Sequence, residues 1–240
     1  MNILITGVSR GLGFSLANFF LDKGNYIFGL SRKKNDNIKL LSSSHPKNFR
    51  HIRCDLLNTN SLKKILYEDL LKDIELHGFV NNAAISYDDL ITNANYEKLN
   101  NMYKINVLSP IMITKLVIRN MILHKNKGSI VHISSISAHT GYKGLSMYGS
   151  TKGAIESFSK SCSREWGTYG IRSNCIVAGF METDMSSSLS PEQKNRIYNR
   201  MAKKEPVSID SVVRTVNYLI SNKNSKSVTG QNIFVDNGTL

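Results

Sequence analysis

Tyr148 and Lys152 are the two side chains in this sequence whose types and spacing most directly suggest chemistry. The apolar pattern after Gly149 is helical, so residues four apart share a face and Tyr148 lies beside Lys152. A free tyrosine keeps its proton up to a pH of about 10. An ammonium about 4 Å away favours the phenolate by roughly 1 kcal/mol in water and roughly 4 kcal/mol at an effective dielectric of 20. The spacing therefore predicts a tyrosine with a lowered pKa, able to act as a general acid or base.

The Tyr-x-x-x-Lys spacing is weak by itself, because the 10 tyrosines and many lysines of this chain make chance pairs common. The alternative is a tyrosine beside a solvated lysine that takes no part in chemistry. The elements around the pair decide between these interpretations, since a general acid needs a cavity and a reaction partner.

Short apolar runs alternate with helical patterns along the chain, which is typical of a parallel sheet with helices on both faces. The expected strands are 2–6, 26–30, 49–54, 79–81, 129–133, 171–177 and 232–235. The expected helices are 12–23, one capped by Asn60 and carrying Leu62, Ile65, Leu66 and Leu70, and then 96–124, 148–169, 191–202 and 208–220. Residues 31–47 form a basic, polar loop in this interpretation. The pattern predicts one doubly wound (Rossmann) α/β domain over residues 1–240, with a substrate flap at about 183–207.

The composition is that of an ordinary globular chain with an unusually basic balance. The net charge is +13, and basic residues gather between Arg32 and Arg53, where Asp36 is the only acid. No aromatic side chains are interleaved with these cations, so we expect a solvated surface rather than a nucleic-acid site. We expect no signal peptide and no membrane span. The 3 cysteines and 6 histidines show no metal-ligand spacing, which favours a reducing cytoplasm and no metal site.

A glycine-rich turn stands between the first expected strand and helix, reading TGVSRGLG from Thr6. Gly7 permits the turn, Gly11 lets the backbone approach a pyrophosphate, and Gly13 lets the helix pack on the strand. The N-terminus of the helix then faces the anion. The position of this turn predicts a dinucleotide site.

The end of the second strand indicates which nicotinamide nucleotide is bound. A carboxylate there would accept a hydrogen bond from the ribose 2′-hydroxyl of NAD, but residues 30–34 read LSRKK and contain no acid. Arg32, together with Arg10 in the glycine turn, can reach a 2′-phosphate with a planar fork of donors. We therefore favour NADP(H) over NAD(H). The alternative is a basic surface loop without a ligand.

The whole chain resembles the short-chain dehydrogenase/reductases of roughly 250 residues, through motifs that stand in the family's order. These are TGVSRGLG at Thr6, CDL at Cys54, NNAA at Asn81, KINV at Lys104, ISSIS at Ile133, YGSTK at Tyr148, AGFMETDM at Ala178 and TGQNIFVDNG at Thr229. Within the family it is most similar to the 3-oxoacyl-[acyl-carrier-protein] reductase group, judging from the segment 179–185 and the C-terminal segment.

The resemblance implies roles for four catalytic residues. Tyr148 would protonate the carbonyl oxygen as hydride arrives, and Lys152 would lower its pKa and hold the nicotinamide ribose. Ser135 would polarise the same oxygen by a hydrogen bond. Successive strand side chains point in opposite directions, so only one of Ser134 and Ser135 can face the site. Asn106 would complete a water-linked proton relay to Lys152.

The resemblance also implies a set of cofactor-binding residues. Asp55 would meet the adenine, Asn82 would begin the cofactor floor, and Thr183 would hold the nicotinamide carboxamide. The full set is Thr6, Gly7, Ser9, Arg10, Gly11, Leu12, Gly13, Ser31, Arg32, Asp55, Leu56, Asn82, Ala83, Ala84, Tyr148, Lys152, Gly179 and Thr183. Ala84 and Ala178 depart from the family pattern, which usually has glycine and proline at these positions.

These observations predict an NADP(H)-dependent enzyme that reduces a ketone to a secondary alcohol, resembling a 3-oxoacyl-[acyl-carrier-protein] reductase. One alternative is a dehydrogenase or reductase of a sugar-derived or other small metabolite. The other is a non-catalytic NADP(H)-binding regulator, although a sensor has no need of a proton donor. The resemblance implies a homotetramer or a homodimer. An acidic carrier protein would be steered by cations, for which the candidates are Lys125, Lys127, Arg196, Arg200, Lys203 and Lys204; the alternative is that they only solvate the surface.

Overall fold

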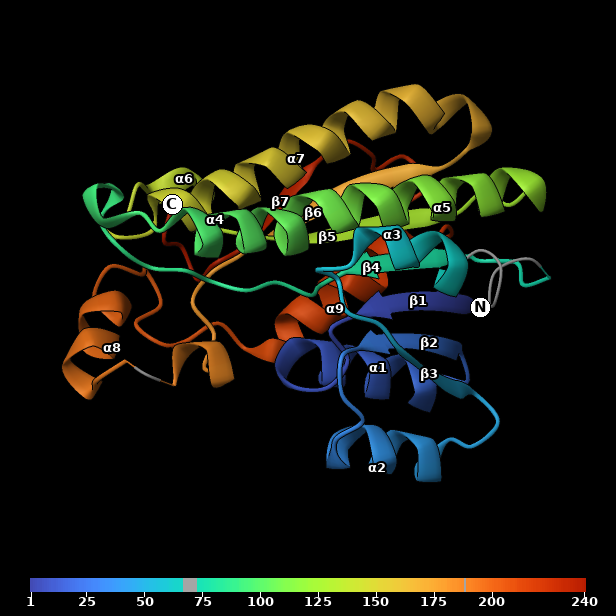
Figure 1. Ribbon diagram of the computed structural model, residues 1–240, viewed down its shortest axis with the longest axis horizontal. Helices are drawn as coiled ribbons and strands as arrows, with labels where there is room; N and C mark the ends of the chain where they lie inside the picture. The colour runs from blue at the N-terminus through green and yellow to red at the C-terminus, as the bar shows by residue number, and fades with distance from the viewer. Residues whose placement is uncertain (67–72, 188) are drawn as a thin grey trace.

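One parallel sheet organises the protein, as predicted (Figure 1). The computed structural model describes residues 1–66, 73–187 and 189–240. Within these ranges seven strands pair in the order β3-β2-β1-β4-β5-β6-β7, and every pairing is parallel. The strands are β1 (Asn2–Thr6), β2 (Tyr26–Ser31), β3 (Phe49–Arg53), β4 (Gly78–Asn81), β5 (Ser129–Ser135), β6 (Arg172–Ala178) and β7 (Asn232–Val235). The predicted doubly wound α/β fold is thereby confirmed.

Helices cover both faces of the sheet (Figure 1). One face carries α3 (Thr59–Leu62), α4 (Tyr96–Tyr103), α5 (Ser109–Leu123) and α7 (Ser146–Trp166), and the other carries α1 (Gly11–Asp22), α2 (Asp36–Ser44) and α9 (Ile209–Ile220). Two short helices, α6 (Ser137–Thr140) and α8 (Pro191–Tyr198), lie beyond the carboxyl ends of the strands. Single turns complete the described chain at η2 (Ile91–Asn93), η3 (Lys104–Leu108), η4 (Gly167–Tyr169) and η5 (Asp184–Ser186).

Two hydrophobic cores follow from the alternation of side chains along the strands. In β1, Ile3 and Ile5 point to the core that α1 and α9 cover, whereas Leu4 points to the core that α5 and α7 cover. All three are fully buried. Burial of such side chains stabilises the fold by roughly 1.5–3 kcal/mol each. Both faces of the strands are therefore apolar, and the polar side chains that do chemistry stand at the strand ends.

The basic segment predicted as a loop contains a helix, α2. Asn35 caps it by accepting a hydrogen bond from the backbone N–H of Ile38, 3.2 Å away. Ile38 and Leu41, three residues apart, are the buried positions of this helix. Two buried apolar residues in a polar segment are too few to predict a helix from periodicity. Packing on α1 and β3 stabilises the helix in the folded protein.

The helix expected near Asn60 also begins differently. Asn58, not Asn60, is the capping residue, since its side chain accepts from the backbone N–H of Ser61. Of the apolar residues assigned to this helix, Leu62 and Leu66 are buried, while Leu70 lies outside the described residues. The later helix α8 ends at Tyr198 rather than at residue 202.

The long helical stretch predicted at 96–124 is present as α4, the π-helical turn η3 and α5. Residues 96–123 are long and apolar enough to cross a membrane by length and composition, but 67% of the most apolar window is buried inside the protein. Figure 1 shows α5 lying along the sheet. Packing in the core thus accounts for the apolar face of this helix.

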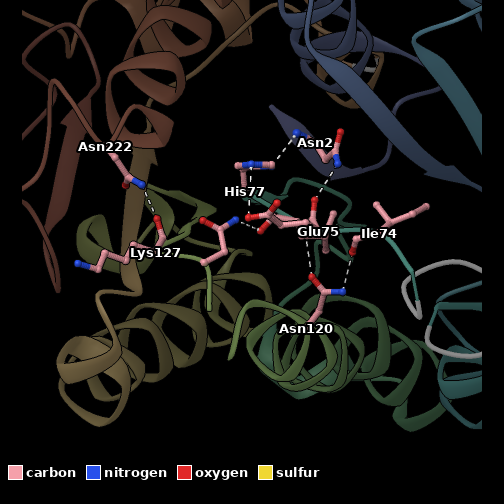
Figure 2. A network of polar contacts seen from close by, with 9 residues as sticks. Asn2, Ile74, Glu75, His77, Asn120, Lys127 and Asn222 are labelled. Atoms are coloured by element: carbon pink, nitrogen blue, oxygen red, sulfur yellow. Dashed lines mark hydrogen bonds and ion pairs between the residues drawn. The ribbon is translucent and has the colours of Figure 1, made fainter. Parts of the chain in front are cut away.

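A polar network closes the amino end of the sheet, away from the helices α6 and α8 (Figure 2). His77 Nδ1 accepts from the backbone N–H of Asn2 at 3.0 Å, and Asn120 donates to the carbonyl of Ile74 at 2.8 Å. Asn222 donates to the carbonyl of Lys127 in the same region. Lys127, and with it Lys125 just before β5, therefore lies at the opposite end of the sheet from Tyr148. These two lysines do not border the site described next.

Candidate functional site

A cavity of about 990 Å³ opens at the carboxyl ends of the parallel strands. This is the edge where open α/β sheets bind ligands, next to the point between β1 and β4 where the strand order reverses. The predicted residues that line it are Gly7, Ser9, Arg10, Gly11, Leu12, Gly13, Ser31, Arg32, Asp55, Leu56, Asn82, Ala83, Ala84, Ser135, Tyr148, Lys152, Gly179 and Thr183. Thr6 and Asn106 are outside the lining, and both are buried.

The glycine turn has the backbone shape that a pyrophosphate requires. Gly7 and Gly11 have φ values of +76° and +52°, in the left-handed region that favours glycine. A Cβ on Gly13 would lie 2.1 Å from the carbonyl oxygen of Gly7, so no larger residue fits there. Arg10, which precedes α1, makes no side-chain capping bond to the helix. The first turn of α1 therefore keeps donors for an anion, and the cradle fits a dinucleotide.

Thr6 shapes this cradle from below instead of lining the cavity. Its hydroxyl oxygen accepts from the backbone N–H groups of Asn82 and Ala83, each at 3.0 Å. The Asn82 side chain donates in return to the carbonyl of Thr6 at 3.0 Å. These bonds hold the segment after β4 against the glycine turn, so Thr6 positions residues that line the cavity.

The end of β2 carries cations and no carboxylate, as the sequence indicated. Arg32 is exposed at the rim of the cavity, while Ser31 is buried and lies 2.8 Å from Nε2 of His51 on β3. The guanidinium of Arg10 lies 3.7 Å from the carboxylate of Asp184. Arg10 thus bridges the glycine turn and η5 across the cavity, and it shares its charge with an acid.

Tyr148 and Ser135 meet inside the cavity, from α7 and the end of β5. The Ser135 hydroxyl favours the ionised form of the Tyr148 phenol, and it accepts a hydrogen bond from the backbone N–H of Ser137 at 3.2 Å. Burial raises the pKa of Tyr148 well above its usual value, the negative charge of Asp88 adds to the rise, and the Ser135 hydroxyl opposes it. Tyr148 is therefore a protonated phenol at neutral pH in this structure.

The net direction is opposite to the expected lowering of the Tyr148 pKa, and the role of Lys152 towards the phenolate stays a prediction. The Lys152 ammonium lies 5.5 Å from the centre of the tyrosine ring and donates instead to the carbonyl of Ile133 at 2.8 Å. Burial also lowers the pKa of Lys152 itself to about 8, although Cys175 and Glu156 oppose the shift. Desolvation disfavours the charged form of both groups and is the largest cause of both shifts.

The neighbouring serine, Ser134, also lines the cavity, but its hydroxyl belongs to a different hydrogen-bond cluster. It donates to the carboxylate of Glu156, which lies one turn beyond Lys152 on α7. The same carboxylate lies 2.8 Å from Nε2 of His139 and accepts from Asn232 at 2.6 Å. Glu156 is buried and joins β5, α6 and β7 to α7. Sequence reasoning missed this cluster, because its members are far apart along the chain.

Asn106 lies in the π-helical turn η3 and binds the segment after β4. Its side chain accepts from the backbone N–H of Ile85 at 2.9 Å and donates to the carbonyl of Ile85 at 2.8 Å. It also donates to the hydroxyl of Thr151, the residue before Lys152. Asn106 therefore connects the cavity wall to α7, while the water-linked relay to Lys152 stays a prediction.

Residues outside the predicted catalytic and cofactor-binding set also line the cavity, from the segments 85–88, 137–145 and 180–200. They are Ile85, Ser86, Asp88, Ser137, Tyr142, Lys143, Leu145, Phe180, Met181, Leu189, Gln193, Arg196, Ile197 and Arg200. The i, i+4 spacing of Arg196 and Arg200 on an expected helix was the available signal for part of this wall. Across the described ranges, no group of three or more His, Cys, Asp or Glu side chains is arranged to hold a metal ion.

Comparison with known proteins agrees with this geometry. Residues 7–239 match the family described as Enoyl-(Acyl carrier protein) reductase. A 3-oxoacyl-[acyl-carrier-protein] reductase of Buchnera aphidicola subsp. Schizaphis graminum is 31% identical over 98% of this chain and 95% of its own length. An L-xylulose reductase of Caenorhabditis elegans is 28% identical over 98% of this chain and 94% of its own length.

Solved structures of similar proteins share the fold over nearly the full chain. The structure described as ElxO with NADP bound has a TM-score of 0.90 at 27% identity, covering 99% of this chain and 98% of the other. A 4-hydroxyisoleucine dehydrogenase complexed with NADH has a TM-score of 0.93 at 22% identity, with the same two coverages, and shows the fold alone. The family match, the relatives and the cavity agree: the chain belongs to the short-chain dehydrogenase/reductase family and is an NAD(P)-dependent oxidoreductase.

Proposed function

We propose that this protein reduces a ketone to a secondary alcohol with NADP(H), in the manner of a 3-oxoacyl-[acyl-carrier-protein] reductase. The observation that carries the proposal is the meeting of Tyr148 and Ser135 in the cavity that also contains the glycine cradle. A proton donor and a dinucleotide cradle in one cavity are the two requirements for adding hydride and proton across a carbonyl.

The cofactor, when bound, supplies the hydride, and the residues of this chain handle the proton. The Ser135 hydroxyl and the Tyr148 phenol are placed to donate hydrogen bonds to one carbonyl oxygen. Burial keeps Tyr148 protonated, which suits an acid that must give up a proton in the direction of reduction. The nearby Lys152 ammonium stabilises the phenolate that remains after the transfer.

The preference for NADP(H) rests on the end of β2. Arg32 is exposed at the rim, and Arg10 approaches from the glycine turn, so two guanidinium groups are available to a 2′-phosphate. Asp55, the nearest acid after β3, accepts a hydrogen bond from the backbone N–H of Leu57 at 3.0 Å.

Two substrate classes are compatible with the cavity. The relative from Buchnera aphidicola, named for its acyl-carrier substrate, favours a 3-oxoacyl thioester. The relative named L-xylulose reductase favours a sugar-derived ketone as the second candidate. A proton donor inside the cavity disfavours a regulator without turnover. In either case the segment 183–207 serves as the substrate flap, because several of its residues, among them Leu189, Arg196 and Arg200, line the cavity with Tyr148.

A cytoplasmic homotetramer or homodimer is the assembly we propose. Apolar side chains on the outer face of the long helices support it, since Leu108 is 49% exposed and Met112 is 38% exposed. Molar mass by light scattering tests the assembly, and a monomer at micromolar concentration would contradict it.

The test is an assay of a panel of ketones with NADPH, in which the decrease of NADPH absorbance measures turnover. The panel contains a 3-oxoacyl group on an acyl carrier protein, the same group on a small thiol, and ketoses of several sizes. Reduction of the thioesters is expected. Turnover of ketoses alone would favour the second candidate, and no turnover with any ketone while NADPH binds would overturn the reductase proposal.

A further inference from the structure

Two arginines line the cavity at and just beyond α8. Arg196 is in the last turn of α8, and Arg200 lies in the turn two residues after the helix ends at Tyr198. The guanidinium of Arg200 lies 5.5 Å from the centre of the Tyr142 ring, in the loop that leads into Tyr148. Arg200 therefore lies beside the loop that leads into Tyr148, and Arg196 lines the same cavity.

The cofactor does not account for these two charges. The cations placed for its phosphates are Arg10 and Arg32, at the glycine turn and the end of β2. Arg10 is close to Asp184 on η5, 3.7 Å from its carboxylate. Arg196 and Arg200 thus form a separate pair of donors at the other side of the same cavity.

The acids near α8 are engaged elsewhere. Glu182 accepts from Lys194 at 3.0 Å and from Tyr198 at 2.9 Å, and Asp184 faces Arg10. Within residues 1–66, 73–187 and 189–240, no ion pair joins Arg196 or Arg200 to a carboxylate. Asp88 is the acid in this part of the lining, and it accepts from the Ser86 hydroxyl.

The geometry points to a substrate that carries an anionic group, a carboxylate or a phosphate, which Arg196 and Arg200 bind while the ketone faces Tyr148 and Ser135. Two guanidinium groups offer planar forks of donors that match the oxygens of either anion. Lys143, beside Tyr142 in the same lining, adds a third positive charge. This inference rests on the proposed ketone reduction and specifies the class of substrate for it.

Matched substrates separate the anion from the rest of the molecule. One pair is acetoacetyl-phosphopantetheine and acetoacetyl-pantetheine, which differ by one phosphate. The other is 4-oxopentanoate and 4-oxopentanamide, which differ by the charge of a carboxylate. A charge-assisted contact predicts a kcat/KM about ten- to hundredfold higher for the charged member of at least one pair. The pair that shows the difference identifies the source of the anion.

Two double variants with the same change of charge provide the control. Arg196→Gln with Arg200→Gln is expected to bring the ratio of the two kcat/KM values close to one, chiefly through KM. Lys203→Gln with Lys204→Gln removes two charges just beyond α8, from residues outside the cavity lining, and is expected to keep the ratio. Equal efficiencies within both pairs for the unmodified enzyme, or an equal loss of the ratio in both variants, would overturn the inference.

Calorimetric binding of phosphopantetheine and pantetheine, and of succinate and succinamide, to the NADP-loaded enzyme keeps the inference testable without turnover. Tighter binding of the charged members, lost with Arg196→Gln and Arg200→Gln, supports the anion site even if no ketone is reduced, and only the reductase proposal then fails. Reduction of neutral and charged ketones with equal efficiency would support the reductase proposal and overturn the anion site. Equal binding of charged and neutral ligands, together with no turnover, would overturn both proposals.

Discussion

At the scale of single residues, Tyr148 is governed by burial more than by its charged neighbour. The phenol loses solvation and faces the negative charge of Asp88, while the Lys152 ammonium is held by a backbone carbonyl. Desolvation of the phenolate is the largest cause of the raised pKa. These effects favour the protonated phenol, which is the state that the proposed reduction requires.

The first prediction concerns that proton. Tyr148→Phe removes the phenol oxygen and keeps the ring, so reduction is expected to fall by about 100-fold or more, the usual contribution of a general acid. NADPH binding, measured by fluorescence titration, is expected to survive, because the glycine cradle is untouched. Turnover above a tenth of the unmodified rate would show that Tyr148 is not the acid.

The second prediction concerns the choice of nucleotide. Arg32→Ala and Arg10→Ala each remove a guanidinium that can face a 2′-phosphate, so NADPH affinity is expected to fall by about tenfold while NADH affinity changes little. Arg10→Ala also frees Asp184 from its ion pair, so the larger selective effect is expected from Arg32→Ala. Calorimetric titrations with both nucleotides measure the difference. The same loss for NADPH and NADH would show that neither arginine reads the phosphate.

At the scale of elements, the site depends on contacts between segments that the sheet brings together. Glu156 on α7 binds side chains from β5, α6 and β7, and it stands one turn from Lys152. Its negative charge opposes the lowering of the lysine pKa. The π-helical turn η3 also joins distant segments, because the Asn106 side chain binds the backbone N–H and carbonyl of Ile85.

The third prediction follows from this cluster. Glu156→Gln keeps the shape and removes the charge, so the pKa of Lys152 is expected to fall below its value of about 8. The ammonium is then lost at a lower pH, and the alkaline limb of kcat against pH moves to lower pH. Glu165→Gln makes the same change of charge at an exposed position of α7 and is the control. An unmoved limb in Glu156→Gln, or an equal movement in both variants, would separate Glu156 from Lys152.

Stability provides a second measurement on the same residue. Glu156→Ala removes the shared acceptor of Ser134, His139 and Asn232. Ser134 is buried, and a buried polar group left unpaired costs about 1–3 kcal/mol, whereas His139 and Asn232 are exposed to water. The free energy of unfolding in urea is therefore expected to fall by about 1–3 kcal/mol. A loss below about 1 kcal/mol would show that solvent replaces the carboxylate.

At the scale of the whole molecule, the net charge of +13 creates a field that an acidic partner would experience. The fold divides the candidate cations into groups. Lys125 and Lys127 lie at the amino end of the sheet, Arg196 and Arg200 line the cavity, and Lys203 and Lys204 are exposed beside it.

The fourth prediction tests whether this field guides an acyl carrier protein. The efficiency of reducing a carrier-bound 3-oxoacyl group is expected to fall with rising salt, because screening weakens steering. The same acyl group on a small neutral thiol should change little. Lys203→Gln with Lys204→Gln should reduce the salt dependence, whereas Lys125→Gln with Lys127→Gln should leave it as it is. Identical salt profiles for carrier and thiol would indicate that the cations only solvate the surface.

The sequence by itself determined the features that depend on neighbouring positions. The alternation of apolar runs and helical patterns indicated the parallel sheet, the spacing of Gly7, Gly11 and Gly13 indicated the cradle, and the end of β2 indicated the absence of a carboxylate. Each of these properties belongs to a few consecutive residues, so a linear pattern contains it.

Only the tertiary structure decided the features that depend on contacts between residues far apart in the sequence. The direction of the Tyr148 pKa depends on burial and on Asp88, 60 positions away. The Glu156 cluster unites residues from 134 to 232, and α2 is stabilised by packing that its own sequence does not reveal. Desolvation and charge act through space, whereas a sequence pattern records only order along the chain; the fold alone determines which groups lose water together.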